Sequence, residues 1–202
     1  MKKSFSLLEI ILVISLIAVV IVVSLPKLSI SKLELATDKI LIYLNYTRYT
    51  AMIDNKYSID DNEWEKKRWT LKFQNCSNEE DGLYFVVYSD ESGGTAHFKK
   101  EETLKDPLNN KYLYSGYDCI PSGNESSDIL LTKKYGIVSV DISCNTTATI
   151  GQISFGEDGK IYSQLGTSIE SITQPCNIKL TDSNNNFSAI IIEPNTGYIH
   201  KQ

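Results

Sequence analysis

The apolar run from Phe5 to Leu25 restricts the possible structures of this chain more than any other feature, because its only polar residues are three serines and Glu9. As one helix it would be roughly 31 Å long, which matches a bilayer hydrocarbon core of about 30 Å. Lys2 and Lys3 precede it, so the positive-inside rule predicts a single-pass membrane protein with its N-terminus in the cytoplasm and residues 26 onward outside. A removable signal peptide is disfavoured, since its apolar core is usually about 7–15 residues and residues 24–27 offer no Ala-x-Ala-like site.

Glu9 is unusual in such a segment. A carboxylate inside a bilayer costs about 2.5–3.5 kcal/mol, so it is a functional candidate. The alternative is structural: Glu9 lies near the cytoplasmic edge, where it can reach the interface and favour the positive end of the helix dipole.

The N-terminal pattern resembles a known family. The run from Lys2 to Glu9, an unbroken apolar helix and then Pro26 resemble the N-terminus of type IV prepilins and type II secretion pseudopilins. The resemblance implies a leader of residues 1–4, cleavage between Ser4 and Phe5 by a prepilin peptidase, and methylation of the Phe5 amine. It also implies that Glu9 neutralises the Phe5 amine of a neighbouring subunit during assembly, and that Pro26 kinks the helix. The location that it implies is the inner (cytoplasmic) membrane, with the body in the periplasm. The family usually has glycine where this chain has Ser4.

Two stripes of apolar and small residues at helical spacing follow Pro26. The first stripe is Leu33, Ala36, Ile40, Leu44, Thr47 and Ala51, and the second is Ile42, Tyr46, Tyr49 and Ile53. They suit a helix that packs both on its own body and on neighbouring helices, or a helix enclosed in a core. Because residues 1–81 contain no glycine, we expect one rigid helix over residues 5–57, with residues 5–25 transmembrane.

Residues 58–202 carry short strand patterns separated by polar turns. The clearest are residues 69–73, 83–88, 138–142, 153–155, 178–180, 187–192 and 198–200. They predict a mostly antiparallel sheet or sandwich, whereas residues 89–128 read as a long irregular excursion. The expected fold is therefore α+β, with a long N-terminal helix followed by a β-rich body, as in the pilin-like fold. Residues 44–51, the Phe155–Gly159 turn and residues 197–199 are similar to H-type (FimT-like) minor pseudopilins.

The four cysteines lie beyond the apolar run, at Cys76, Cys119, Cys144 and Cys176. In an exported, oxidising compartment an even number indicates two disulfides, with three possible connectivities. We favour the sequential pairing, with buried free thiols as the alternative. Zinc is disfavoured because no Cys-x-x-Cys pair occurs.

One segment has partial calcium-loop spacing. Asp182, Asn184, Asn186 and Glu193 occupy the first, third, fifth and twelfth positions of such a loop, but Phe187 stands where glycine is needed. An Asn-rich hairpin tip explains the same residues. We therefore expect no cofactor, with calcium as the weaker alternative.

Catalytic motifs are absent from the sequence: it contains no nucleophile elbow, phosphate-binding loop or His-Glu-x-x-His helix. The net charge is −5 and would be −7 after loss of Lys2 and Lys3, so any DNA contact would need a local patch at residues 65–69 or His200–Lys201.

These patterns predict a non-enzymatic structural subunit, a minor pseudopilin of a type II secretion-like system. Its expected partners are other pseudopilins, prepilin peptidase and inner-membrane lipid, with no small-molecule substrate. The alternatives are a minor type IV pilin that assists DNA uptake, and an uncleaved single-pass protein with an external binding domain.

Overall fold

The computed structural model describes residues 6–24, 31–77, 82–91, 98–144, 150–162 and 171–202. The chain divides into two compact units, Met1–Ile30 and Ser31–Gln202. The first unit contains the helix α1, Leu7–Ser24, and the second contains the remaining helices and all the strands. Ser4, Phe5 and Pro26 lie outside the described residues.

The expectation of one helix over residues 5–57 is wrong. The described residues form α1 and a separate helix α2, Lys32–Ile53. Ser31 has extended backbone angles and its side chain accepts a hydrogen bond from the Glu34 N–H, so it caps a new helix. Asp54 ends that helix. The predicted fold fails with it, because the pilin-like architecture requires a single long N-terminal helix.

The described residues of the body form two antiparallel sheets, each of four strands. The first sheet has the order β2-β1-β4-β5, with bounds β2 Leu83–Tyr88, β1 Trp69–Asn75, β4 Gly151–Phe155 and β5 Ile161–Tyr162. The second has the order β3-β6-β7-β8, with bounds β3 Ile137–Ile142, β6 Cys176–Asp182, β7 Phe187–Ile192 and β8 Ile199–Lys201.

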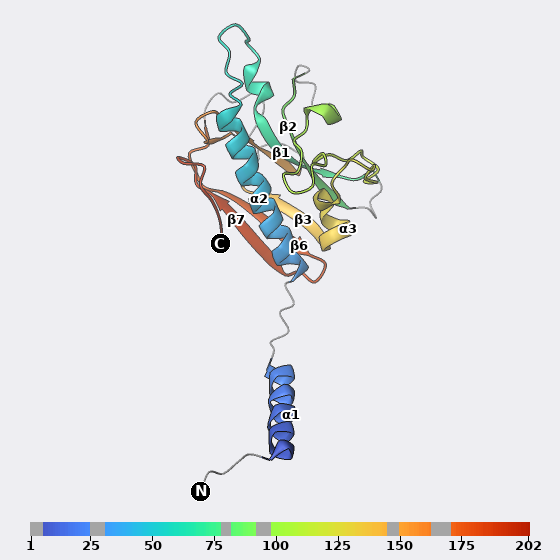
Figure 1. Cartoon of the computed structure of the whole chain (residues 1–202). Helices are drawn as coiled ribbons and strands as arrows, with labels where there is room; N and C mark the ends of the chain where they lie inside the picture. Colours follow the sequence, from blue (N-terminus) through green and yellow to red (C-terminus); the bar gives the residue numbers. More distant parts are fainter. Residues whose placement is uncertain (1–5, 25–30, 78–81, 92–97, 145–149, 163–170) are drawn as a thin grey trace. The chain divides into compact units, whose positions relative to one another are not determined.

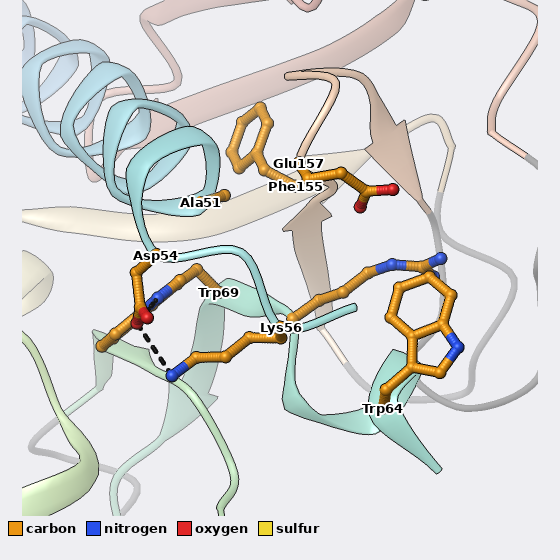
Figure 2. Close-up of a pocket in the computed structure, with 8 residues that line it drawn as sticks. Ala51, Asp54, Lys56, Trp64, Trp69, Phe155 and Glu157 are labelled. Atoms are coloured by element: carbon orange, nitrogen blue, oxygen red, sulfur yellow. Dashed lines mark hydrogen bonds and ion pairs between the residues drawn. The ribbon is translucent and has the colours of Figure 1, made fainter. Parts of the chain in front are cut away.

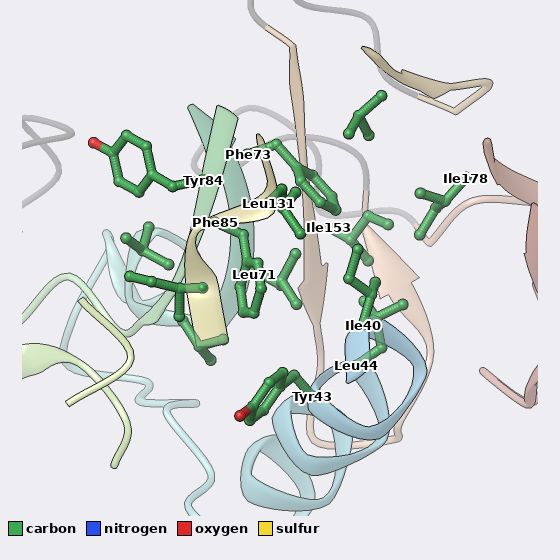
Figure 3. Packing of buried hydrophobic residues seen from close by; sticks show 14 of the residues in the cluster. Ile40, Tyr43, Leu44, Leu71, Phe73, Tyr84, Phe85, Leu131, Ile153 and Ile178 are labelled. Atoms are coloured by element: carbon green, nitrogen blue, oxygen red, sulfur yellow. The ribbon is translucent and has the colours of Figure 1, made fainter. Parts of the chain in front are cut away.

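Helix α2 lies against strands of both sheets (Figure 1). Its first apolar stripe is buried: Ile40, Leu44 and Ala36 have no exposed surface. Figure 3 shows Ile40 and Leu44 beside the apolar side chains of the sheets, and the Tyr43 ring lies 5.4 Å from that of Phe85. The core therefore forms where the helix covers both sheets.

The segment between β2 and β3 contains mainly turns and short helices, as expected for an irregular excursion. The short elements of the body are η1 Trp64–Lys67, η3 Lys100–Glu102, η4 Ser127–Ile129 and α3 Leu131–Tyr135. Disulfides join Cys76 to Cys119 and Cys144 to Cys176, which confirms the sequential pairing.

Candidate assembly surfaces

Helix α1 is apolar on every side. Each side chain from Ser6 to Val20 is exposed, Glu9 included. Leu7 is 77% exposed and Val20 is 61% exposed, so both ends of this stretch present apolar surface. A helix that is apolar all round is normally buried by other molecules or other parts of a protein. Glu9 adds one carboxylate, in the first turn of the helix.

The transmembrane prediction is wrong for the described residues, none of whose helices is long and apolar enough to cross a membrane. Helix α1 has 18 residues, which gives roughly 27 Å instead of the roughly 31 Å expected from the apolar run. It also carries Glu9 within that shorter length. This finding overturns the predicted single-pass location in the inner membrane.

The second stripe of α2 faces outward. Ile42, Tyr49 and Ile53 are 47%, 59% and 65% exposed, and Tyr46 is partly exposed. The exposure of this stripe makes the enclosed-core alternative wrong, whereas packing against neighbouring helices stays a prediction. One face is buried in the body, and the other remains available for a neighbouring molecule.

The three segments that the sequence pattern singled out come together at Arg48 of α2. They are residues 44–51, the Phe155–Gly159 turn and residues 197–199. Its Nε donates to the Gly159 carbonyl, at 3.1 Å, and its Nη2 donates to the Thr196 carbonyl, at 2.8 Å. Gly159 follows β4 in the first sheet, whereas Thr196 lies between β7 and β8 in the second. Arg48 thus joins the helix to a turn of each sheet. The sequence pattern singled out the three segments but did not predict that they meet.

A small recess lies at the C-terminal end of α2 (Figure 2). It encloses about 180 Å³ when its open mouth is counted, but its interior has room for only about one water molecule, which is far too little for a usual small-molecule ligand. Lys56 lies 2.8 Å from the Asp54 carboxylate, which also accepts from the Trp69 indole N–H. Burial raises the pKa of Asp54, but the hydrogen bonds from Lys56 and Trp69 outweigh it and hold the pKa below its ordinary value. The two charged side chains Asp54 and Lys56 that line the recess are therefore paired with each other.

The basic clusters singled out for DNA contact are engaged within the chain. Lys66 pairs with Glu63, and Lys67 pairs with Asp61 at 2.6 Å. The Arg68 guanidinium is buried, 3.7 Å from the centre of the Tyr162 ring.

The C-terminal cluster is engaged in the same way. Lys201 pairs with Glu34 and Asp38 at 2.8 and 2.7 Å, and His200 lies 3.3 Å from Glu193. Neither cluster presents a row of unpaired cations to a phosphate backbone.

The candidate calcium ligands do not converge. The Asp182 carboxylate accepts hydrogen bonds from the Asn184 N–H and from the Asn186 backbone and side-chain N–H groups, so it holds its own turn. Glu193 follows the whole of β7, which spans roughly 20 Å, and it faces His200. Within the described parts of the chain, no three His, Cys, Asp or Glu residues cluster as metal ligands would.

A third basic cluster escaped the sequence analysis. Lys100 and Lys105 place their ammonium groups 5.6 and 4.8 Å from the centre of the Tyr112 ring. The signal was the density of lysine between residues 99 and 111, but Glu101, Glu102 and Asp106 in the same stretch concealed which lysines would remain unpaired.

Comparison of the chain with protein-family models, curated proteins and solved structures finds no match in any of the three.

Proposed function

We propose that this chain is a non-enzymatic structural subunit of the minor pseudopilin type, which assembles with other subunits through α1. The observation that carries the proposal is the exposure of eleven large apolar side chains on this one helix. Exposed apolar surface of this extent marks an interaction site. Covering each such side chain contributes roughly 1.5–3 kcal/mol, so association through α1 is strongly favourable.

Glu9 gives this apolar contact its specificity. A carboxylate buried among apolar helices needs a cationic partner, and the N-terminal resemblance supplies one in the Phe5 amine of a neighbouring subunit after cleavage behind Ser4. Breaking a buried ion pair costs about 3–5 kcal/mol, whereas the intact pair adds little net stability. The pair therefore sets the register of neighbouring subunits.

The outer stripe of α2 supports the same proposal. Ile42, Tyr49 and Ile53 form an apolar row that a second helix can cover by side-chain packing. Together with α1, this row gives the subunit two apolar helical surfaces for contact with neighbouring subunits.

Between a secretion filament and a DNA-uptake filament we propose the secretion filament, because the cations at residues 65–69 and 200–201 are engaged within the chain. A DNA-uptake role would require a salt-dependent interaction of the full chain with DNA.

Mass spectrometry of the mature N-terminus tests the processing step. A chain that begins at N-methylated Phe5 is the expected result. An intact Met1 in assembled material would contradict the proposed processing.

The assembly step is tested by Glu9→Gln, with Glu101→Gln on the body as the matched control, since both carboxylates are exposed. We expect the Glu9 variant to lose roughly 100- to 1,000-fold in subunit affinity, measured by sedimentation of assembled material. The control should assemble normally. Equal behaviour of both variants would contradict the role of Glu9, and failure of the native chain to assemble would contradict the proposed function.

A further inference from the structure

The excursion between β2 and η4 contains a hairpin that the proposed assembly does not use, residues 104–113. Its two arms are joined at Lys105 and Tyr112, and by hydrogen bonds from the Asp106 N–H to the Lys111 carbonyl and from the Leu113 N–H to the Leu104 carbonyl, both 2.7 Å. The Leu104 N–H also donates to the Val87 carbonyl of β2, at 2.9 Å. The hairpin is thus attached to the edge of the first sheet.

Asp106 holds the hairpin in one shape. Its carboxylate is buried, with the residue 1% exposed, and it accepts from the Leu108 N–H, the Asn109 amide and the Tyr43 hydroxyl at 2.9, 3.0 and 2.9 Å. The last of these bonds anchors the turn to α2. Since each acceptor oxygen is engaged, the tip keeps its conformation without a ligand, which reduces the entropy cost of binding.

The surface of this hairpin is positive although the chain is acidic. Lys105 and Lys111 are exposed, and neither has an ion pair with any residue that the structure describes. The one carboxylate of the hairpin, Asp106, points inward. Lys105 extends over the Tyr112 ring, and Lys100 approaches the same ring while it pairs with Glu125 at 2.6 Å.

An apolar group completes the patch. Leu108 at the tip is 75% exposed, and Tyr112 is half-buried between the two ammonium groups. The cations are lysines, which attract carboxylates as point charges, and the hairpin lacks the arginine forks that read phosphates and bases in two-point contacts. A mixed acidic and apolar peptide fits this chemistry better than a nucleic acid does.

We propose that the hairpin of residues 104–113 is a preformed docking site for an acidic, extended segment of a partner protein. Carboxylates of the segment pair with Lys105 and Lys111, and its apolar side chains contact Leu108 and the Tyr112 ring. The hydrogen bonds of Asp106 hold the site in one conformation, so the partner alone becomes ordered on binding.

The test uses the full chain and a short fluorescent peptide of alternating glutamate and leucine. The site variant is Lys105→Glu/Lys111→Glu. The control is Lys32→Glu/Lys179→Glu, which changes the net charge equally at two exposed lysines outside the hairpin. Fluorescence anisotropy at several salt concentrations gives the affinity, and thermal unfolding shows that each variant is folded.

We expect the native chain to bind the peptide more weakly as salt rises, the site variant to lose about tenfold or more in affinity, and the control to lose less than about threefold. Equal losses in both variants, or no salt-dependent binding by the native chain, would overturn the proposal. A parallel titration with oligothymidylate separates the two macromolecular classes: tighter binding of that probe, lost in the site variant, would also overturn it and assign the patch to nucleic acid.

Discussion

Arg48 and two glycines, Gly159 and Gly197, form a close contact in the body. Gly197 has a φ of +61°, and a Cβ atom placed there would lie 1.9 Å from the Gly159 carbonyl oxygen. Gly159 has a φ of +72°, and a Cβ there would meet the Arg48 Nε at 3.1 Å. Both turns need glycine for their backbone angles and for their approach to each other, so the Arg48 hydrogen bonds depend on the absence of two side chains.

Gly197→Ala is expected to destabilise the protein by about 2–4 kcal/mol, because it combines a left-handed alanine with a backbone clash. Chemical denaturation measures the change in the free energy of unfolding. Gly123→Ala is the matched control: no atom lies within 4 Å of the position that a Cβ would take there, and it should change stability by less than about 0.5 kcal/mol. Similar losses of unfolding free energy in both variants would show that the backbone around Gly197 moves to make room for the added methyl group.

Asp128 joins α2 to the short helices that precede β3. Its carboxylate pairs with Lys39 of α2 at 2.8 Å and with Lys134 of α3. Burial raises the pKa of Asp128, but the hydrogen bonds from Lys134 and Lys39 outweigh it, so the pKa lies below its ordinary value. The carboxylate therefore favours the folded state most when it is ionised.

The contribution of Asp128 should depend on pH. Because the folded-state pKa is the lower one, the stabilisation is present at neutral pH and disappears as the pH falls below about 4. Asp128→Asn should cost about 1 kcal/mol at pH 7, after allowance for solvent screening. Urea titrations of both proteins should converge in acid. A difference that persists or grows below that pH would show that the loss is one of packing.

The two disulfides should stabilise the body almost equally. They join cysteines 43 and 32 residues apart in sequence, and the loop-closure contribution changes only with the logarithm of that length. Replacing either pair with alanine should cost about 4 kcal/mol in the chain-entropy account. Denaturant unfolding of the two double variants measures both losses, and a threefold difference between them would point to native-state strain or residual structure.

The strands could be predicted from the sequence, whereas the start of a separate helix at Lys32 could not. Leu83–Tyr88 appeared with its observed bounds, since a continuous apolar run between polar turns has few alternatives. The start of α2 depends on the Ser31 cap, a local signal that lies within an otherwise helical pattern. The hairpin of residues 104–113 was hidden because its anchor, the Asp106–Tyr43 bond, joins residues 63 apart.

Part of each candidate site could also be predicted. The outer stripe of α2 followed from spacing alone, because periodicity reports which residues share a face. The meeting of three segments at Arg48 required the topology of both sheets, and the unpaired state of Lys105 and Lys111 required knowing that Asp106 turns inward. Charge counts along the sequence cannot distinguish a buried carboxylate from an exposed one.

The division of the chain into two units predicts what removal of the first one does. Ser31–Gln202 holds the whole buried core, from Leu33 to Ile199. A chain truncated to residues 31–202 should fold with an unfolding midpoint within about 2 °C of the full chain, and it should sediment as a monomer where the full chain associates. Association of the truncated chain to the same extent would place the assembly contact on the body.

The position of β8 has a consequence for synthesis. Helix α2 is synthesised well before the partners of its Arg48 and Glu34, which are Thr196 and Lys201. At about 5–20 residues per second, roughly 10–30 s separate the two events on the ribosome. Throughout that interval Arg48 and Glu34 lack these partners, so the contact between α2 and the end of the second sheet can form only after β8 has been synthesised.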